Sequence, residues 1–267
     1  MTAAWVAFLT DYGLADGYVA ACHGVIARIA PAARVIDVTH EVPAQDVRHG
    51  AVVLADTLPY LPPSVLLAVV DPEVGTQRRA VAVVAGEHVL VGPDNGLLPW
   101  AADAAGGAAR AVELTAPEFR LDTGATTFDG RDVFAPAAAH LAAGADLSVL
   151  GPPVDVATLV RLPDPWLRVR PETIEAEVHV VDRFGNVALA AGAAELTAAD
   201  LDEHARLRVT VGERSSYLPL AASYAAVPEG DPVLLVDSAG RLALAVNRGS
   251  AAAELGLRPG DRVTISS

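Results

Sequence analysis

Several polar segments directly follow apolar runs in the first half of the sequence. Asp11 follows residues 5–10, the run Asp71–Arg78 follows residues 65–70, and Pro93–Gly96 follows residues 88–91. In open α/β sheets, ligands bind beyond the carboxyl ends of the strands, so chemistry is expected at these positions. Ordinary turns are the competing interpretation, because Pro, Asp, Asn and Gly are the usual turn residues.

The run Asp71-Pro-Glu-Val-Gly-Thr-Gln-Arg78 places a carboxylate and a guanidinium in one loop. A guanidinium stays charged and can stabilise developing hydroxide, and a carboxylate can orient both the guanidinium and a water molecule. The alternative is a simple turn at Gly75-Thr76, with Arg78 in solvent. The loop by itself leaves both interpretations open.

Asp11 and Asp129 are the other acidic candidates in this half. Asp11 suits a sugar diol, because one carboxylate can accept from two neighbouring hydroxyls, but it can also cap a turn. With Asp16 it faintly resembles the acidic metal loop of a calcium-dependent nucleoside hydrolase, although the clustering is sparse. Asp129 or Asp132 can cap the helix that follows, where the helix N-terminus can also hold a nucleophile.

In the second half, Phe184-Gly-Asn186 offers an aromatic ring for stacking and an amide that can donate to and accept from an adenine edge. A strand-to-strand turn is the alternative there, as at Asp237–Gly240 and Asn247–Ala251. The histidines lack metal-ligand spacing, so no metal site is predicted. Cys22 is a single cysteine, which excludes an internal disulfide and fits a reducing compartment.

The pattern of apolar runs predicts an N-terminal α/β domain with a mostly parallel but mixed sheet, and a smaller C-terminal, mainly antiparallel β domain. The first has strands at 5–10, 34–38, 65–70, 80–85 and 88–91 and helices at 16–29, 46–58 and 133–143. The second has strands at 174–181, 206–211, 233–236, 242–246 and 262–265. We expect the domains at 1–163 and 174–267, joined by a proline-rich linker at 164–173.

The chain of 267 residues carries a formal charge of -14, which argues against nucleic acid and anionic membranes as partners. No apolar run approaches the roughly 20 residues of a membrane helix, and the N-terminus lacks the features of a signal peptide. These features predict a soluble, cytoplasmic protein.

Short motifs occur in a fixed order along nearly the whole chain: Phe8–Gly13, Ile36–His40, Val70–Arg79, Gly92–Gly96, Phe128–Asp132, Phe184–Asn186 and Asn247–Ala251. Together they resemble the S-adenosylmethionine hydroxide adenosyltransferases, which are related to the S-adenosylmethionine fluorinase and chlorinase. The resemblance implies attack of water or hydroxide on the ribose C5′ of S-adenosylmethionine, releasing adenosine and methionine without a cofactor. It also implies a homotrimer whose active sites lie between one subunit's N-terminal domain and its neighbour's C-terminal domain.

The resemblance further implies a role for each substrate-binding residue. Asp11 would bind the ribose hydroxyls. The adenine would be bound by Asn186 and the backbone near Arg248, with Phe184 and Tyr224 on its faces. The methionine amino and carboxylate ends would be held by Asp182 and Ser238.

The hydrolytic branch of that family carries an Asp, an Arg and a His near the nucleophile. Asp71 and Arg78 stand at the first two positions, and Asp129 replaces the histidine of a Phe-His-Gly-Arg-Asp motif. Glu73 is a smaller departure, because glycine is common there. Asp71, Arg78 and Asp129 are therefore the predicted catalytic residues, with Asp129 able to act as the base in place of imidazole.

The sequence leaves two alternative functions open. A halide-using adenosyltransferase is disfavoured by Asp71, because a carboxylate repels an anionic nucleophile. A non-catalytic binder of adenosine or S-adenosylmethionine is the other, with Asp129 marking the decay of the reaction centre.

Overall fold

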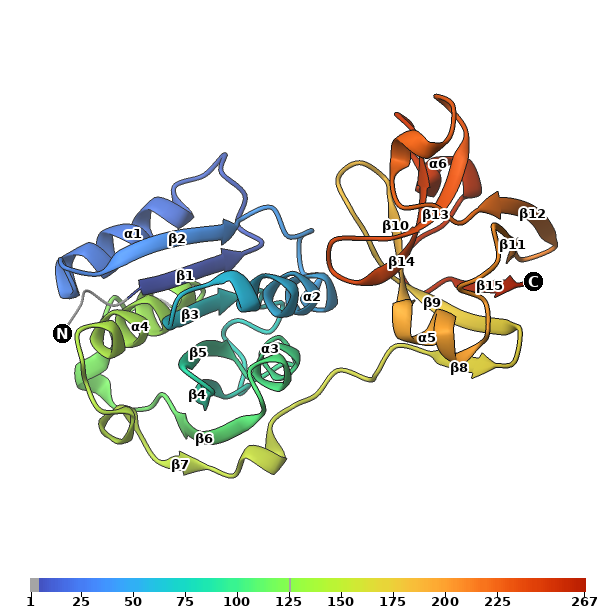
Figure 1. Cartoon of the computed structure of the whole chain (residues 1–267). Helices are drawn as coiled ribbons and strands as arrows, with labels where there is room; N and C mark the ends of the chain where they lie inside the picture. Colours follow the sequence, from blue (N-terminus) through green and yellow to red (C-terminus); the bar gives the residue numbers. More distant parts are fainter. Residues whose placement is uncertain (1–4, 125) are drawn as a thin grey trace. The chain divides into compact units, whose positions relative to one another are not determined.

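The computed structural model describes residues 5–124 and 126–267, and the chain divides into two compact units between Leu162 and Pro163 (Figure 1). The N-terminal unit is built on a seven-stranded mixed sheet with the order β2-β1-β3-β5-β4-β6-β7. Its first four strands pair in parallel, and its last four pair antiparallel. The strands are β1 (Trp5–Thr10), β2 (Arg34–Thr39), β3 (Ser64–Val69), β4 (Ala80–Ala85), β5 (His88–Pro93), β6 (Ala108–Glu113) and β7 (Pro153–Val154).

Helices cover both faces of this sheet, as the alternation of side chains along β1 requires. Val6 and Phe8 belong to a buried cluster with α1 (Tyr18–Ile29) and α4 (Ala135–Ala142). Ala7 and Leu9 belong to the opposite cluster, with α2 (Val47–Thr57) and α3 (Pro99–Ala104). Both faces of the parallel strands are therefore buried, which explains their nearly continuous apolar sequences.

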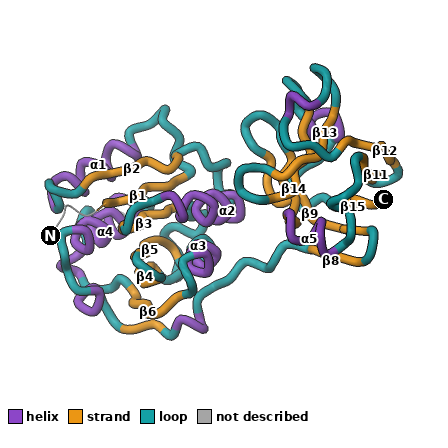
Figure 2. Tube along the Cα trace, viewed as in Figure 1, coloured by secondary structure: helices purple, strands orange, loops and turns teal. Residues whose placement is uncertain are grey.

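The C-terminal unit is an antiparallel β structure, and strands dominate it in Figure 2. Its sheet runs β12-β11-β15-β9-β10-β14-β13, and β8 pairs with β9. The elements are β8 (Leu167–Arg170), β9 (Thr173–Val181), β10 (Val187–Gly192), α5 (Ala193–Ala198), β11 (Arg206–Val211), β12 (Arg214–Pro219), β13 (Pro232–Val236), β14 (Arg241–Val246), α6 (Ala251–Leu255) and β15 (Arg262–Ser266).

The predicted fold class is confirmed, and the differences are local. β6, β7, β10 and β12 lie where no strand was predicted, and β8 lies within the stretch 164–173 that was predicted as a linker. The helix predicted at 133–143 begins earlier, with a π-helical turn at Gly130–Phe134, before α4. Single-turn 3₁₀ helices connect other elements at Leu58–Tyr60, Pro117–Phe119, Leu147–Leu150, Val156–Thr158 and Tyr224–Ala226. In the described part of the chain, no helix is long and apolar enough to span a membrane.

Candidate active site

The loop between β3 and β4 folds back so that its two charged ends meet. The Nε of Arg78 lies 3.1 Å from each carboxylate oxygen of Asp71, and its Nη2 lies 2.6 Å from Oδ2 of Asp71. Gly75 has φ +80°, a conformation that favours glycine, and a Cβ there would lie 3.0 Å from the backbone carbonyl oxygen of Thr126. The predicted turn at Gly75 is therefore present, and it positions Arg78 on Asp71 instead of leaving it in solvent.

Asp129 completes this charged cluster from a distant part of the chain. Its Oδ2 accepts a hydrogen bond from Nη2 of Arg78, the same nitrogen that contacts Asp71. The side chains of Asp71, Arg78 and Asp129 are only 5%, 6% and 20% exposed. The guanidinium also lies 5.1 Å from the ring centroid of Phe134. The structure thus brings the three predicted catalytic residues together in a largely buried position.

Burial by itself lowers the pKa of Arg78, but the hydrogen bonds and charges of Asp71 and Asp129 outweigh it and raise the pKa above its ordinary value. The guanidinium therefore stays charged at any pH at which the protein is folded. A fixed cation in a place with little water stabilises a developing anion strongly, because water does not screen it.

The helix-capping interpretation of the segment 126–132 is wrong for Asp129. Asp129 stands at the start of the π-helical turn, but its side chain makes no capping hydrogen bond. Asp132 serves a structural role instead, accepting from Arg131 at 2.7 Å and from Thr123 at 2.8 Å. Such π-helical turns are often found at functional sites, and this one brings Asp129 to the end of the sheet.

A pocket of about 170 Å³ opens beside the cluster, lined by Asp71, Asp129 and Asp11 among other residues. Asp11 follows β1, and its Oδ2 accepts from the backbone N–H of Gln45 at 2.8 Å. Gln45 itself adopts φ +67°, a left-handed conformation that is uncommon outside glycine. This contact holds the Asp11 carboxylate at the pocket, where neighbouring hydroxyls can approach it.

An aromatic wall also lines this pocket, formed by Tyr12, Tyr18 and Phe128. The ring centroids of Tyr12 and Phe128 lie 5.7 Å apart, and those of Tyr18 and Phe128 lie 5.2 Å apart, both edge to face. No role was predicted for Tyr12 or Tyr18 from the sequence. The position of Tyr12 directly after Asp11 was the signal that could have indicated it as a pocket residue. Burial first, then the coupling to the Cys22 thiol and the negative charges of Asp11, Asp71 and Asp129, raise the pKa of Tyr12, so its hydroxyl stays protonated.

The other predicted binding residues line a second pocket, of about 800 Å³, in the C-terminal unit. They are Asp182, Phe184, Asn186, Tyr224, Ser238 and Arg248. Phe184 is 74% exposed and Tyr224 is 44% exposed, which leaves aromatic surface available for stacking.

Asp182 organises the loop that carries Phe184 and Asn186. Its Oδ1 accepts from the backbone N–H of Phe184 at 2.8 Å and of Asn186 at 2.9 Å, and its Oδ2 accepts from Nδ2 of Asn186 at 2.7 Å. Gly185 between them has φ +83°, and a Cβ there would lie 2.0 Å from Oγ of Ser250. The turn predicted for this motif is real, and it presents an aromatic ring and an amide together.

The segment Pro93–Gly96 has a structural role. Asp94 accepts from Nε of Arg79 and from the backbone N–H of Val160, each at 2.8 Å. Asn95 donates from Nδ2 to the carbonyl of Val70 at 2.8 Å. Asn95 thus fixes Val70 directly before Asp71, and Asp94 fixes Arg79 directly after Arg78. The motif therefore supports the site without lining its pocket.

The chain is similar to known proteins along nearly its whole length. Residues 6–151 match the family model of the SAM hydroxide adenosyltransferase N-terminal domain, and residues 176–264 match that of the C-terminal domain. An (R)-S-adenosyl-L-methionine hydrolase of Salinispora arenicola is 53% identical over 98% of each chain. A fluorinase of Actinopolyspora mzabensis is 29% identical over 98% of this chain and 96% of its own.

A crystal structure of an uncharacterized conserved protein from Thermotoga maritima superposes with a TM-score of 0.92 at 36% identity, covering 98% of this chain and 100% of that one. Both halves of the chain therefore match the same family, in the order that the motifs indicated. The resemblance drawn from the motifs is confirmed, and the chain belongs to the S-adenosylmethionine hydroxide adenosyltransferase family.

Proposed function

We propose that this protein hydrolyses S-adenosylmethionine to adenosine and methionine. The observation that carries the proposal is the buried guanidinium of Arg78, held by Asp71 and Asp129 at a pocket that also contains Asp11. Three carboxylates, those of Asp11, Asp71 and Asp129, line this pocket, and only two of them are paired with the guanidinium. The pocket therefore favours a cationic substrate such as a sulfonium and disfavours a halide ion as the nucleophile.

The reaction needs an aligned nucleophile in a site with little bulk water. The oxygen of a water molecule attacks the ribose C5′, and the C5′–S bond breaks with its electron pair moving to sulfur. Methionine then leaves as a neutral thioether, so neither a general acid nor a cofactor is required. Arg78 stabilises the developing hydroxide, Asp71 orients the guanidinium and the water, and Asp129 accepts the proton.

Each substrate group has a matching place in the two pockets. Asp11 accepts hydrogen bonds from the ribose diol. Asn186 and the backbone near Arg248 bind the adenine edge, and Phe184 and Tyr224 cover its faces. In the same pocket, Asp182 and Ser238 contact the methionine amino and carboxylate groups.

The proposal includes a homotrimer in the cytoplasm. Support comes from the distribution of the predicted residues: the reaction centre lines a pocket of one unit and the adenine-binding residues line a pocket of the other. In the trimer, one subunit's N-terminal unit and its neighbour's C-terminal unit enclose each substrate. Light scattering should give the trimer mass. We expect Asp71→Asn and Phe184→Ala each to lower the activity. Mixing subunits of the two variants, after dissociation and reassembly, should restore part of it, because some sites then combine the two unaltered halves.

The test of the activity is product analysis in oxygen-18 water, with and without added chloride or fluoride. We expect adenosine that carries oxygen-18 at its 5′ hydroxyl, together with unlabelled methionine, in both conditions. A 5′-halogenated nucleoside that forms only with halide would establish the halogenase instead. Tight calorimetric binding of S-adenosylmethionine without any product would establish a non-catalytic binder.

A further inference from the structure

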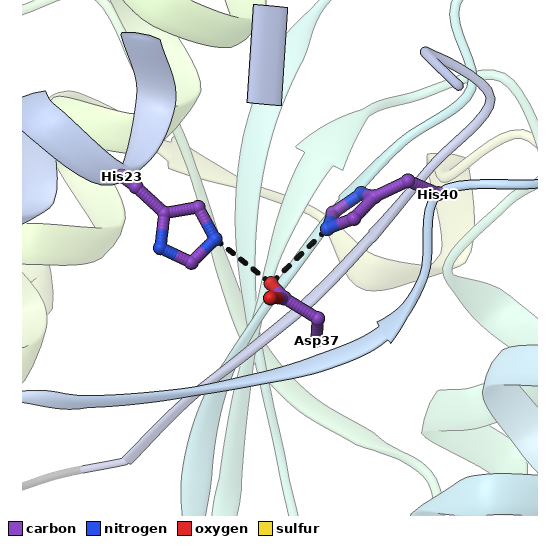
Figure 3. A group of neighbouring side chains, drawn as sticks. All are labelled: His23, Asp37 and His40. Atoms are coloured by element: carbon purple, nitrogen blue, oxygen red, sulfur yellow. Dashed lines mark hydrogen bonds and ion pairs between the residues drawn. The ribbon is translucent and has the colours of Figure 1, made fainter. Parts of the chain in front are cut away.

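A group of polar side chains from three segments meets on one face of the N-terminal unit, and Figure 3 shows how they converge. His23 comes from α1, Asp37 from β2, and His40 from the residue after β2. The Oδ1 of Asp37 lies 2.8 Å from Nε2 of His23 and 3.0 Å from Nε2 of His40. One ligand atom from each residue lies within 4.8 Å of the other two. No role in the proposed reaction is assigned to these residues.

Contacts with Thr10 and Phe8 fix the orientation of the His40 ring. Its side chain is 4% exposed, its Nδ1 lies 2.9 Å from Oγ1 of Thr10, and its ring packs edge to face on Phe8 with 4.7 Å between the centroids. A metal-bound histidine usually donates its other ring N–H to an oxygen, which fixes the tautomer and directs the ligand nitrogen. Thr10 supplies that oxygen, and Nε2 of His40 is directed at Asp37.

The other two ligands, His23 and Asp37, are the accessible members of the group. Asp37 contributes a carboxylate whose Oδ1 lies within hydrogen-bond distance of Nε2 of both histidines. The side chains of His23 and Asp37 are 34% and 48% exposed, so an ion can enter from solvent and both side chains can adjust around it.

We propose that His23, Asp37 and His40 form a binding site for a divalent transition-metal ion, with Zn²⁺ as the best match. Two imidazole nitrogens and one carboxylate oxygen are characteristic ligands of zinc, and imidazole disfavours Mg²⁺ and Ca²⁺. Zinc bonds of roughly 2.0–2.2 Å require the ion to take the place of the protons now shared with Oδ1 of Asp37, with small shifts of the two exposed side chains. Water completes the coordination on the exposed side.

This site is connected to the pocket beside the reaction centre. The backbone N–H of Gly13 donates to the carbonyl of His40 at 2.7 Å, and the backbone N–H of Tyr12 donates to Oγ1 of Thr10 at 3.2 Å. An ion at His40 therefore ties α1 and β2 to the segment that carries Asp11. The expected consequence is a more stable N-terminal unit, whether or not the metal changes turnover.

The test is zinc binding by tag-free full-length protein that has been treated with a chelator and then dialysed. We expect one Zn²⁺ per chain by calorimetry and elemental analysis, and a rise in Tm of about 5 °C at saturation. Co²⁺ should give the intense visible absorption of a low-symmetry, tetrahedral-like site. These measurements do not depend on the hydrolase activity, so failure of either proposal can be recognised separately.

His23→Ala and Asp37→Asn are the decisive variants, because both side chains are partly exposed and their replacement leaves the core intact. Each should lose the stoichiometric binding and the Tm shift. Asp16→Asn and His204→Ala, which change residues outside this group, should keep both. Absence of binding in the parent protein, or unchanged binding in His23→Ala and Asp37→Asn, would overturn the proposal.

Discussion

Arg78 meets Asp71 through two of its nitrogens, with Nε 3.1 Å from both carboxylate oxygens and Nη2 2.6 Å from Oδ2. Because Nη2 also contacts Asp129, one guanidinium connects the end of β3 to the start of the π-helical turn. The planar group is thus fixed in orientation, which a more flexible cation would not be.

Arg78→Lys should therefore lower kcat by about 100-fold while changing KM little, since lysine keeps the charge but cannot reproduce the planar contacts. Steady-state adenosine formation measures both constants. Arg214→Lys, an exposed change on β12, is the matched control and should retain parental kinetics. Parental kcat in Arg78→Lys would show that the charge alone suffices and that the fixed geometry does not matter.

Asp129→His restores the residue that the resemblance led us to expect at this position. Imidazole has an ordinary pKa of about 6.5, so the pH profile of kcat should gain an ionisation between roughly pH 6 and 7 that the parent lacks. The variant should remain active, whereas Asp129→Ala should lose at least about 10-fold in kcat. An Asp129→Ala variant with the parental kcat at all pH values would remove Asp129 from proton transfer.

Gly130→Ala tests the aromatic wall of the same pocket. A Cβ at this position would lie 2.0 Å from the hydroxyl oxygen of Tyr12 and 3.2 Å from Cε2 of Phe128, so both rings must move. We expect a higher KM for S-adenosylmethionine and a lower kcat, measured at constant temperature.

The matched control is Gly24→Ala in the interior of α1, where a Cβ meets no atom within 4 Å. That change should raise the free energy of unfolding by about 0.5–1 kcal/mol, because alanine is the better helix former, with kinetics unaltered. Equal kinetics of the two variants would show that the tyrosine can move without consequence.

The sequence predicted the contact of Asp71 with Arg78 better than it predicted the contacts that support this pair. Asp71 and Arg78 lie in one loop after a buried apolar strand, so a local pattern was enough to pair them. The contact of Asp129 with Arg78 spans 51 residues and depends on the π-helical turn, which no sequence pattern encodes. Only the motif at 128–132 indicated Asp129 as a candidate residue.

The group His23, Asp37 and His40 is a second case in which spacing along the chain does not show which residues meet in space. Its spacing matches no metal-ligand pattern, and the sequence analysis predicted no metal site. The parallel pairing of β1 with β2 and the packing of α1 bring these residues together, which is information about topology that spacing along the chain does not contain. In the C-terminal pocket, by contrast, the family resemblance named six of the lining residues, three of them outside the quoted motifs.

The last prediction concerns acid stability, through the buried histidine His88. It begins β5, is 8% exposed, and its Nδ1 lies 3.3 Å from Oγ of Ser64. Burial lowers its pKa more than Glu87 and Ser64 raise it, so the folded protein keeps the ring neutral below the ordinary value of about 6.5.

Below that pH the unfolded chain binds a proton that the folded protein does not, so the free energy of unfolding must fall as the pH is lowered. Urea midpoints measured from pH 8 to pH 5 should therefore decrease, and His88→Gln should flatten part of that decrease. At pH 8 the ring is neutral in both states, so comparing the variant with the parent there isolates the change in packing. If the variant keeps the full parental slope between pH 7 and 5, His88 does not contribute to the acid destabilisation.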